Sequence, residues 1–218
     1  MIAGVIDIVE GEVRKFREPA VTQVARRRDP YQVLVSCIIS LRTRDETTAA
    51  ASARLFHEAE TPEGMVKLSE EKIGALIKPA NYYKTKAKNI LRISRILIEE
   101  HGSRVPETIE ELLKLPGVGR KTANIVIVFG HGKMGMPIDT HCHRIPNRLG
   151  WVHTKTPEQT ERELRKLIPK THWMKFNDVF VTFGQNICKP VKPLCNICPV
   201  TKYCNYYERY VRPGSSPA

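Results

Sequence analysis

LPGVGRKTANIV, residues 115–126, places two glycines and two cations directly before an apolar segment. TIEELLKL (108–115) and KTANIVIVFG (121–130), on either side of the glycines, both have helical periodicity. The pattern therefore predicts two helices joined by a tight turn. Gly117 and Gly119 can adopt backbone angles that other residues avoid, and they leave their amide N–H groups uncovered.

The turn has the composition of a phosphate seat built from backbone amides. The N–H groups of the turn and of the first turn of the next helix can together bind an anion. Such a seat needs no base-specific side chain, so it would hold a nucleic-acid backbone without reading its sequence. We expect Gly117, Val118, Gly119 and Arg120 to contact DNA in this way. The alternative is an ordinary tight connection between two helices.

Lys121 is the unusual residue of this stretch, because a cation at a helix N-terminus opposes the positive end of the helix dipole. It either contacts solvent or a phosphate, or it has a chemical task. Arg120 and the helix end disfavour the charged amine, so Lys121 can act as a nucleophile near neutral pH. An amine that attacks a sugar C1′ needs a carboxylate nearby to stabilise the developing positive charge. Asp139, in PIDTHCHRIPNRLG, is the candidate, and as a helix N-cap it would also stay ionised.

The whole chain is strongly basic. Lys and Arg total 35 against 23 Asp and Glu, a formal net charge of +12 over 218 residues. The bases are spread over helical segments and are dense at RKFR (14–17), ARRR (25–28) and YKTKAK (83–88). This distribution favours a nucleic-acid-binding face over a basic tail.

The chain also lacks the marks of an exported or membrane protein. No apolar run approaches the roughly 18 residues of a membrane span. The N-terminal residues lack the basic-then-apolar order of a signal peptide. We expect a cytoplasmic protein, associated with the nucleoid if prokaryotic, with no secretion or targeting signal and no membrane partner.

Helix signals are dense along the rest of the chain. Asp29-Pro30 is typical of an N-cap followed by proline in the first turn. Similar starts are predicted at Asp45, at Thr61-Pro62 and at Ser69, and helical period continues over 84–101, 156–169 and 171–188. Segments with strand-like alternation are few; IVIVF (125–129) fits a buried strand but continues a helical pattern. The predicted fold class is all-α, with short helices joined by short turns.

Four of the six cysteines form the pattern Cys188-x6-Cys195-x2-Cys198-x5-Cys204. Four thiolates suit either a zinc ion or an iron–sulfur cluster, and spacing alone does not decide between them. The set leaves no open coordination position, which favours a structural site. Lys189, Lys192 and Lys202 lie between the ligands with three prolines, so the loop is predicted to be a rigid, basic surface for phosphates. Cys37, in an apolar run, is interpreted as a small core residue.

Three motifs in this order, LPGVGRKTAN, IDTH-x-x-R-x-x-NRLG and the cysteine loop, resemble the endonuclease III family of DNA glycosylases, within the helix–hairpin–helix superfamily. The resemblance covers roughly residues 20–206. It implies two α-helical lobes with the active-site cleft between them. One is a six-helix barrel over 22–133, with the hairpin at about 109–129. The other joins 1–21 to 134–210 and holds the cysteine loop 188–204; residues 211–218 are expected to be a disordered tail.

The resemblance also implies a reaction and assigns residues to it. Cys188, Cys195, Cys198 and Cys204 match the ligands of a [4Fe-4S] cluster, Lys121 the nucleophilic lysine and Asp139 the catalytic aspartate. The implied partner is double-stranded DNA with a damaged base or an abasic site, bound by a monomer. A damaged, typically oxidised, pyrimidine would be flipped out of the duplex. Lys121 would displace it, form a Schiff base with the opened sugar and cut the strand 3′ of the lesion by β-elimination.

Two positions depart from the family pattern. Arg42, in IISLRTRD (38–45), replaces the usual glutamine that helps fill the gap left by the flipped base. Tyr82, in NYYKTKAKNI (81–90), stands where a leucine wedge is usual. We predict that both contact DNA, since tyrosine can stack on bases; the alternative for Tyr82 is an exposed amphipathic aromatic. Both changes leave the preferred lesion and opposite base open.

Two other functions fit parts of the pattern. One is a monofunctional mismatch glycosylase, acting on thymine or uracil opposite guanine, in which Lys121 only holds a phosphate. Family branches with that activity, and those that remove adenine, generally lack a lysine at the position of Lys121. The other is a non-enzymatic helical DNA-binding module with a four-cysteine zinc site.

Several polar residues beside Asp139 also have two interpretations. Arg144 and Arg148 either contact phosphates or brace the cysteine loop, and a salt bridge suits them equally well. His141 and His143 resemble a metal pair, but a spacing of two residues points them apart on a helix. We expect these histidines to be structural or DNA-facing and not metal ligands.

Overall fold

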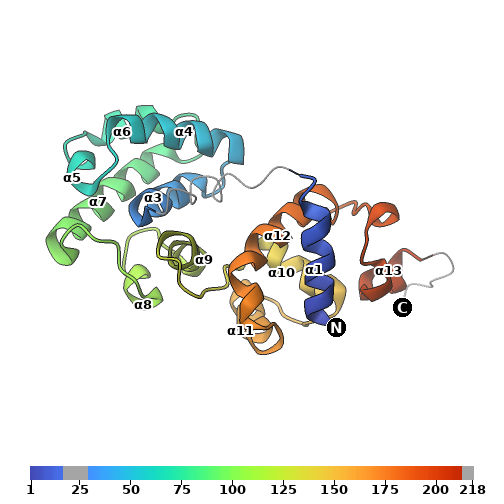
Figure 1. Ribbon diagram of the computed structural model, residues 1–218. Coiled ribbons are helices and arrows are strands. Elements are labelled where there is room, and N and C mark those ends of the chain that lie inside the picture. The colour runs from blue at the N-terminus through green and yellow to red at the C-terminus, as the bar shows by residue number, and fades with distance from the viewer. Residues whose placement is uncertain (17–28, 213–218) are drawn as a thin grey trace. The chain divides into compact units, whose positions relative to one another are not determined.

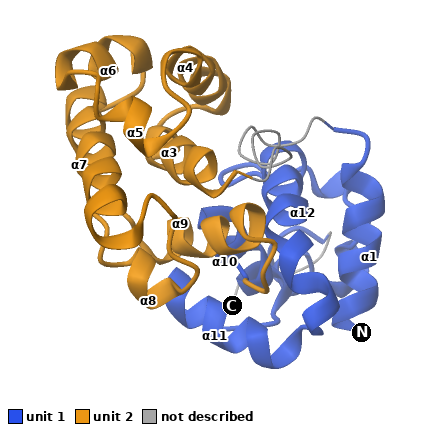
Figure 2. Ribbon diagram, turned by 60° about the vertical axis from the view of Figure 1, so that its left-hand side comes forward, with its two compact units in different colours: residues 1–18, 136–218 blue, residues 19–135 orange. Residues whose placement is uncertain are grey.

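A computed structural model describes residues 1–16 and 29–212 of the chain. Every regular element in these residues is a helix, so the predicted all-α class is confirmed (Figure 1). The chain divides into two compact units, one of residues 19–135 and the other of residues 1–18 and 136–218 (Figure 2). The predicted lobe boundary at 21/22, the basic stretch 25–28 and positions 213–218 of the predicted tail lie outside the described residues.

The unit of residues 19–135 is built around a buried helix, α3. Its helices are α3 (Pro30–Ser40), α4 (Asp45–Glu58), α5 (Pro62–Met65), α6 (Glu70–Ile77), α7 (Tyr83–His101), α8 (Ile109–Leu112) and α9 (Arg120–Ile125), which continues as a π-helix, η1 (Val126–Gly130). The Asp29 carboxylate accepts a hydrogen bond from Gln32 N at 2.8 Å, which confirms the predicted N-cap. Every residue of α3 from Tyr31 to Ile39 is buried, and α4, α7, α9 and η1 pack against it.

The other helix starts of this unit follow the predictions with one exception. Thr61 and Ser69 accept hydrogen bonds from Gly64 N and Lys72 N and cap α5 and α6 as predicted. The prediction of Asp45 as an N-cap is wrong. Helix α4 begins at Asp45 itself, after an extended Arg44 whose side chain caps nothing. Asp45 still lies in the first turn, where a negative charge favours the helix dipole.

The unit of residues 1–18 and 136–218 is built around α12 (Trp173–Asn186). Phe176, Phe180 and Phe183 are among the largest fully buried side chains of the described residues. The first two rings stack with centroids 4.3 Å apart, and each such side chain contributes about 1.5–3 kcal/mol when buried. Helix α12 contacts α1 (Ile2–Val13) and α10 (Thr140–Leu149), and α10 contacts α11 (Pro157–Leu167) and α13 (Asn205–Tyr210).

Three short 3₁₀ turns complete the second unit, η2 (Lys170–His172), η3 (Cys195–Ile197) and η4 (Thr201–Tyr203). Two of them lie inside the cysteine loop. Past α13, the amides of Val211 and Arg212 still donate to Tyr207 O, so the first two residues of the predicted tail are held by the helix. None of the described helices combines the length and the hydropathy that a membrane span needs.

Candidate functional site

The predicted hairpin is present as α8, a tight turn and α9. Gly117 has φ +77°, and a Cβ built on it would lie 2.6 Å from Asn89 Nδ2 in α7. A glycine is therefore needed at this position, as predicted. Gly119 differs, because its φ of −98° suits any residue and no heavy atom lies within 4 Å of a built Cβ. Its lack of a side chain leaves open space above the turn.

The turn is anchored by a buried residue, and its exposed residues present backbone amides to solvent. Val118 is buried, and its N–H donates to Leu115 O at 3.2 Å. Helix α9 makes its first backbone bond from Ala123 N to Gly119 O at 2.9 Å. The amides of Gly119 and Lys121 have no backbone acceptor within the described chain, and both residues are exposed. An anion is the natural acceptor for such groups.

Lys121 is exposed in the first turn of α9 and lies near enough to α3 for its charge to act there. The evidence is its effect on Cys37, which is 2 % exposed in α3. Burial raises the pKa of the Cys37 thiol to about 12, and the positive charge of Lys121 opposes that rise. The interpretation of Cys37 as a small core residue is consistent with this burial.

Asp139 is the N-cap of α10. Its Oδ1 accepts hydrogen bonds from His141 N at 2.9 Å and from Cys142 N at 2.8 Å. Both bonds use Oδ1, so the cap does not occupy Oδ2. Asp139 is half-buried and lies in the unit of residues 1–18 and 136–218, whereas Lys121 lies in the unit of residues 19–135.

Arg42 and Tyr82, the two departures from the family pattern, are brought together in one unit. Both have left-handed backbone angles, with φ of 54° and 56°, and both are exposed. Asn81 links their loops, because its side-chain amide donates to Arg42 O and its backbone N–H donates to Thr43 Oγ1 at 3.2 Å. Tyr82 is 64 % exposed, so its ring is available for stacking.

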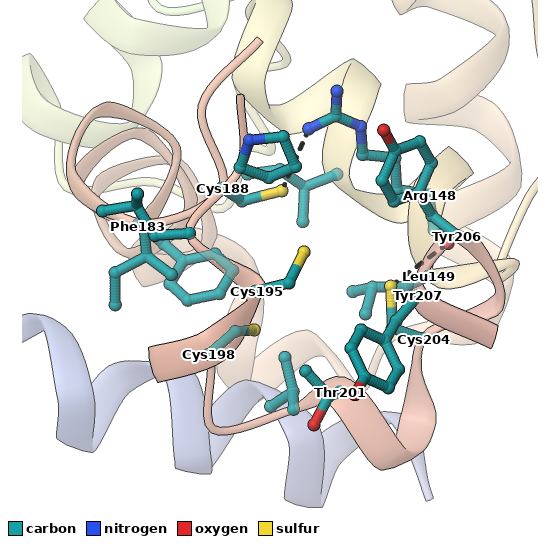
Figure 3. A pocket seen from close by; sticks show the side chains of 15 residues that line it. Arg148, Leu149, Phe183, Cys188, Cys195, Cys198, Thr201, Cys204, Tyr206 and Tyr207 are labelled. Carbon is teal, nitrogen blue, oxygen red and sulfur yellow. Dashed lines mark hydrogen bonds between the residues drawn. The ribbon is translucent and has the colours of Figure 1, made fainter. Parts of the chain in front are cut away.

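The four cysteines of the loop line one pocket (Figure 3). They come from the segment just after α12, from η3 and the residue after it, and from the N-cap of α13. The rest of the lining is largely apolar and includes Ile145, Leu149, Phe183, Ile187, Leu194 and Val200. The lining explains the thiol properties: burial raises the pKa of Cys198 to about 11 and also raises the pKa of Cys195 and Cys204, with further increases from the neighbouring cysteines.

The two predicted metal sites, a zinc ion and an iron–sulfur cluster, place different demands on the four sulfur atoms. A tetrahedral zinc ion would need all four sulfurs about 2.3 Å from one point. No three His, Cys, Asp or Glu side chains of the described residues converge in a way that could hold one metal ion. In a [4Fe-4S] cluster each cysteine binds a different iron, so the four sulfurs surround a volume. All four cysteines line the pocket in Figure 3.

Arg144 and Arg148 brace the segment that carries Cys188. Arg144 Nη2 donates to Cys188 O at 2.7 Å. Arg148 donates to Lys189 O at 2.7 Å, to Pro190 O at 2.6 Å and to Cys188 Sγ at 3.4 Å. Of the alternatives for these two arginines, the structure supports bracing of the loop.

Two aromatic residues of the pocket were missed in the sequence. Tyr206 and Tyr207 line it, and the Arg148 guanidinium lies 4.6 Å from the ring centroid of Tyr206. The sequence signal for them was the pair of tyrosines that is separated from Cys204 by a single residue.

The two histidines of α10 contact separate partners. His143 Nδ1 is 2.6 Å from Thr160 Oγ1, and His141 Nδ1 accepts from Arg144 Nη2 at 3.1 Å.

The basic side chains of the loop point to solvent. Lys189 and Lys192 are exposed, and Val191 between them is 86 % exposed. Lys202 is also exposed and lies 4.9 Å from the ring centroid of Tyr203. The pocket thus holds the cysteines on its inside while its loop carries lysines on the outside.

Comparison with known proteins gives matches over most of the chain. The model of the family described as HhH-GPD superfamily base excision DNA repair protein matches residues 35–170. Endonuclease III of Thermotoga maritima is 51 % identical over 184 residues, which cover 84 % of this chain and 86 % of that protein.

Solved structures match as well. A trapped endonuclease III–DNA covalent intermediate superposes with a TM-score of 0.78 at 32 % identity, over 82 % of this chain and 84 % of that one. A thermostable thymine-DNA glycosylase superposes with a TM-score of 0.81 at 25 % identity, over 95 % of this chain and 94 % of the other.

Proposed function

The chain belongs to the endonuclease III family, within the HhH-GPD superfamily of base excision DNA repair proteins, and from this membership we propose that it removes damaged pyrimidines from duplex DNA. It is a DNA glycosylase with AP lyase activity, and oxidised pyrimidines are its substrate class. The observation that carries the assignment of its chemistry is the position of Lys121, exposed in the first turn of α9 directly after the glycine turn.

Lys121 is the nucleophile of the first step. Its neutral amine attacks C1′ of the damaged nucleotide, a C–N bond forms, and the bond between C1′ and the base breaks. The base leaves with the bonding electron pair and takes a proton. The C1′–O4′ bond then breaks to open the sugar ring, O4′ takes a proton from the amine, and a Schiff base forms between Nζ and C1′.

The same Schiff base drives strand cleavage. It acidifies the protons on C2′, and loss of one of them allows the C3′–O bond to break by β-elimination. The strand is therefore cut on the 3′ side of the lesion, and water later releases Lys121. One amine thus accounts for both base removal and strand cutting.

Asp139 supplies the negative charge for this chemistry. The capping bonds at Oδ1 fix its carboxylate at the start of α10. A carboxylate held in this way can stabilise the positive charge that develops on the sugar as the base leaves. Its role is distinct from that of Lys121, because it forms no bond to the sugar.

The DNA backbone is held by groups that carry no sequence information. The exposed amides of Gly119 and Lys121 bind one phosphate, with Gly117 and Arg120 beside them, and Lys189 and Lys192 contact others. The expectation that the Val118 amide also binds the phosphate is wrong, because its N–H already donates to Leu115 O. Arg42 and Tyr82 contact the duplex where the damaged base has left it. The partner is therefore duplex DNA with a damaged base or an abasic site, bound by a monomer.

The cofactor is a [4Fe-4S] cluster held by Cys188, Cys195, Cys198 and Cys204. Membership of the endonuclease III family and the one pocket that all four cysteines share support this assignment over zinc. The cluster would supply four iron–thiolate bonds that fold the loop, with no part in the bond-breaking steps. Purified protein should be brown and contain four iron atoms per chain. Cys198→Ser should lose iron, whereas Cys37→Ser should keep it; zinc in place of iron would contradict the assignment.

The decisive test of the reaction is covalent trapping. Wild-type protein, an abasic-site duplex and borohydride should give a covalent complex, because borohydride reduces the Schiff base. Lys121→Gln should abolish trapping and base release. Lys114→Gln, on the other side of the same turn and exposed, should leave both intact. Base release without strand cutting by the wild type would instead identify a monofunctional glycosylase.

A further inference from the structure

Lys86, in the first turn of α7, is a buried cation. Its side chain is 5 % exposed. The ammonium donates to Ile39 O at 2.7 Å, to Leu41 O at 2.7 Å and to Thr43 Oγ1 at 2.8 Å. All three donor hydrogens of the ammonium are therefore used. Its partners are uncharged oxygens at the end of α3 and in the loop that follows.

Burying an ammonium in an interface between helices is energetically unfavourable. Taking a charge out of water costs several kcal/mol unless its environment compensates. Here the compensation comes from the C-terminal carbonyls of α3, which carry the negative end of the helix dipole. Burial lowers the pKa of Lys86 to about 8, so the side chain still carries its charge at neutral pH. An apolar residue would pack without this cost, so the contacts made by the ammonium need an explanation.

The contacts of Lys86 enclose Arg42. Leu41 and Thr43, which accept from the ammonium, are its two chain neighbours. The link to Tyr82 is equally short: Thr43 Oγ1 also accepts from Asn81 N at 3.2 Å, and Asn81 Nδ2 donates to Arg42 O. On the helix itself, Lys86 N donates to Tyr82 O at 3.0 Å.

The two enclosed residues have strained backbones. Neither Arg42 nor Tyr82 is glycine or asparagine, yet both are left-handed. This conformation costs roughly 1–2 kcal/mol for each such residue, and it persists only where surrounding contacts determine it. In this conformation two exposed side chains, the guanidinium of Arg42 and the phenol of Tyr82, extend from adjoining loops.

We propose that Lys86 is a positioning residue that ties the loops of Arg42 and Tyr82 into one rigid insertion unit, which acts when the damaged base leaves the duplex. This inference rests on the proposed glycosylase function. A wedge works only if its backbone does not yield when it is pushed between stacked bases. The three bonds from one buried ammonium supply that rigidity to both loops, while the charge itself never reaches the DNA.

The test compares two duplexes with the same oxidised pyrimidine. In one the lesion faces a purine, and in the other it faces an abasic-site analogue, where no pair has to be opened and no opposite base remains. Base release is measured in single turnovers for wild type, Lys86→Met and Thr43→Val. We expect both variants to slow release from the paired duplex about ten-fold or more and from the unpaired one less than about two-fold, because misplacing a contact by 1 Å can cost 10²-fold.

Lys88→Met is the matched control. Lys88 lies on the same helix and is exposed, so this variant loses the same charge without touching the α3 loop. It should change both duplexes by the same factor. In a Tyr82→Ala background, Lys86→Met should add little to the defect on the paired duplex, because the two residues act through one unit.

The outcomes separate the inference from the function it rests on. A wild type that releases base from neither duplex overturns both. An active wild type whose Lys86→Met variant slows both duplexes equally, or adds its full effect to Tyr82→Ala, overturns the inference alone. Melting temperatures identify any variant that does not fold. If Lys86→Met is unfolded, Thr43→Val decides, since it removes one of the three acceptors and keeps the shape of the side chain.

Discussion

Asp139 is the N-cap of α10, and the proposed mechanism adds a chemical task that substitution can separate from capping. Asparagine is as good an N-cap as aspartate but carries no charge, whereas alanine loses both properties. Asp139→Asn should therefore keep the melting temperature of the wild type and lose most base release. Asp139→Ala should also lose about 0.5–2 kcal/mol of unfolding free energy. Urea denaturation and single-turnover base release measure the two effects; an Asn variant with full activity would remove Asp139 from the chemistry.

Lys86 gives a pH dependence of stability whose sign is fixed. Its pKa is about 8 in the folded protein against 10.5 for an unperturbed lysine, so the unfolded chain binds more protons between these values. Stability due to this residue therefore rises with pH across this window, by up to about 1.4 kcal/mol per pH unit. The unfolding free energy of wild type minus that of Lys86→Met should increase from pH 8 to pH 10. Parallel curves for the two proteins would contradict this burial effect.

The glycine turn offers a matched pair at the level of the element. Gly117→Ala must adopt φ +77° and place a Cβ 2.6 Å from Asn89 Nδ2, so it should cost about 1–2 kcal/mol of unfolding free energy. Gly119→Ala meets no atom within 4 Å at an ordinary φ, so it should change stability by less than about 0.5 kcal/mol. Equal losses for the two variants in urea denaturation would show that the turn tolerates neither.

The helices show what periodicity could and could not predict. Caps at Asp29, Thr61 and Ser69 were predictable because a side-chain acceptor three residues before a free amide is a local feature. Asp45 was not, since an acid in the first turn and an acid at the cap give the same pattern. The burial of Lys86 had a signal that went unused: it is in register with Ile90, Ile93 and Leu97 on the apolar face of α7. Its partners lie more than forty residues away, beyond the reach of periodicity.

The parts of the candidate site differ in how far the sequence alone could predict them. The proposed cysteine ligands and the proposed nucleophile Lys121 come from short motifs, where spacing within one loop or turn limits the geometry. Contacts across the fold decide which of the two glycines must adopt a left-handed backbone conformation. They also decide which arginines brace the loop. Arg148, for example, reaches Lys189 O and Pro190 O some forty residues away. No local pattern specifies such a contact.

At the scale of the whole molecule, the net charge of +12 should appear as a salt dependence of DNA binding. Each lysine that neutralises a phosphate contributes about 0.9 to the slope of log K against log salt. Lys189→Gln with Lys192→Gln should therefore lower the slope by up to about 1.8. Fluorescence anisotropy with an uncleavable abasic analogue, over a series of salt concentrations, measures it.

The control for this slope uses lysines that are already paired. Lys15 and Lys166 lie 2.9 Å and 2.8 Å from Glu12 and Glu163 on their own helices. Replacing both with glutamine removes the same formal charge from the protein. The slope should then stay at the wild-type value, and an equal fall in both double variants would mean that only net charge matters.

Helix α1 has a consequence for the order in which the chain is made. Its Val5, Ile6 and Val9 are buried in the core that α12 completes, yet about 160 residues of synthesis separate the two segments. The unit of residues 19–135 has its own core and can fold on the ribosome as soon as it emerges. The apolar side of helix α1 stays exposed until the last third of the chain has been synthesised. The cysteine loop is also among the last segments to be made, so the proposed cluster could be loaded only at the end of synthesis. A nascent chain stalled before Trp173 holds α1 without its partner.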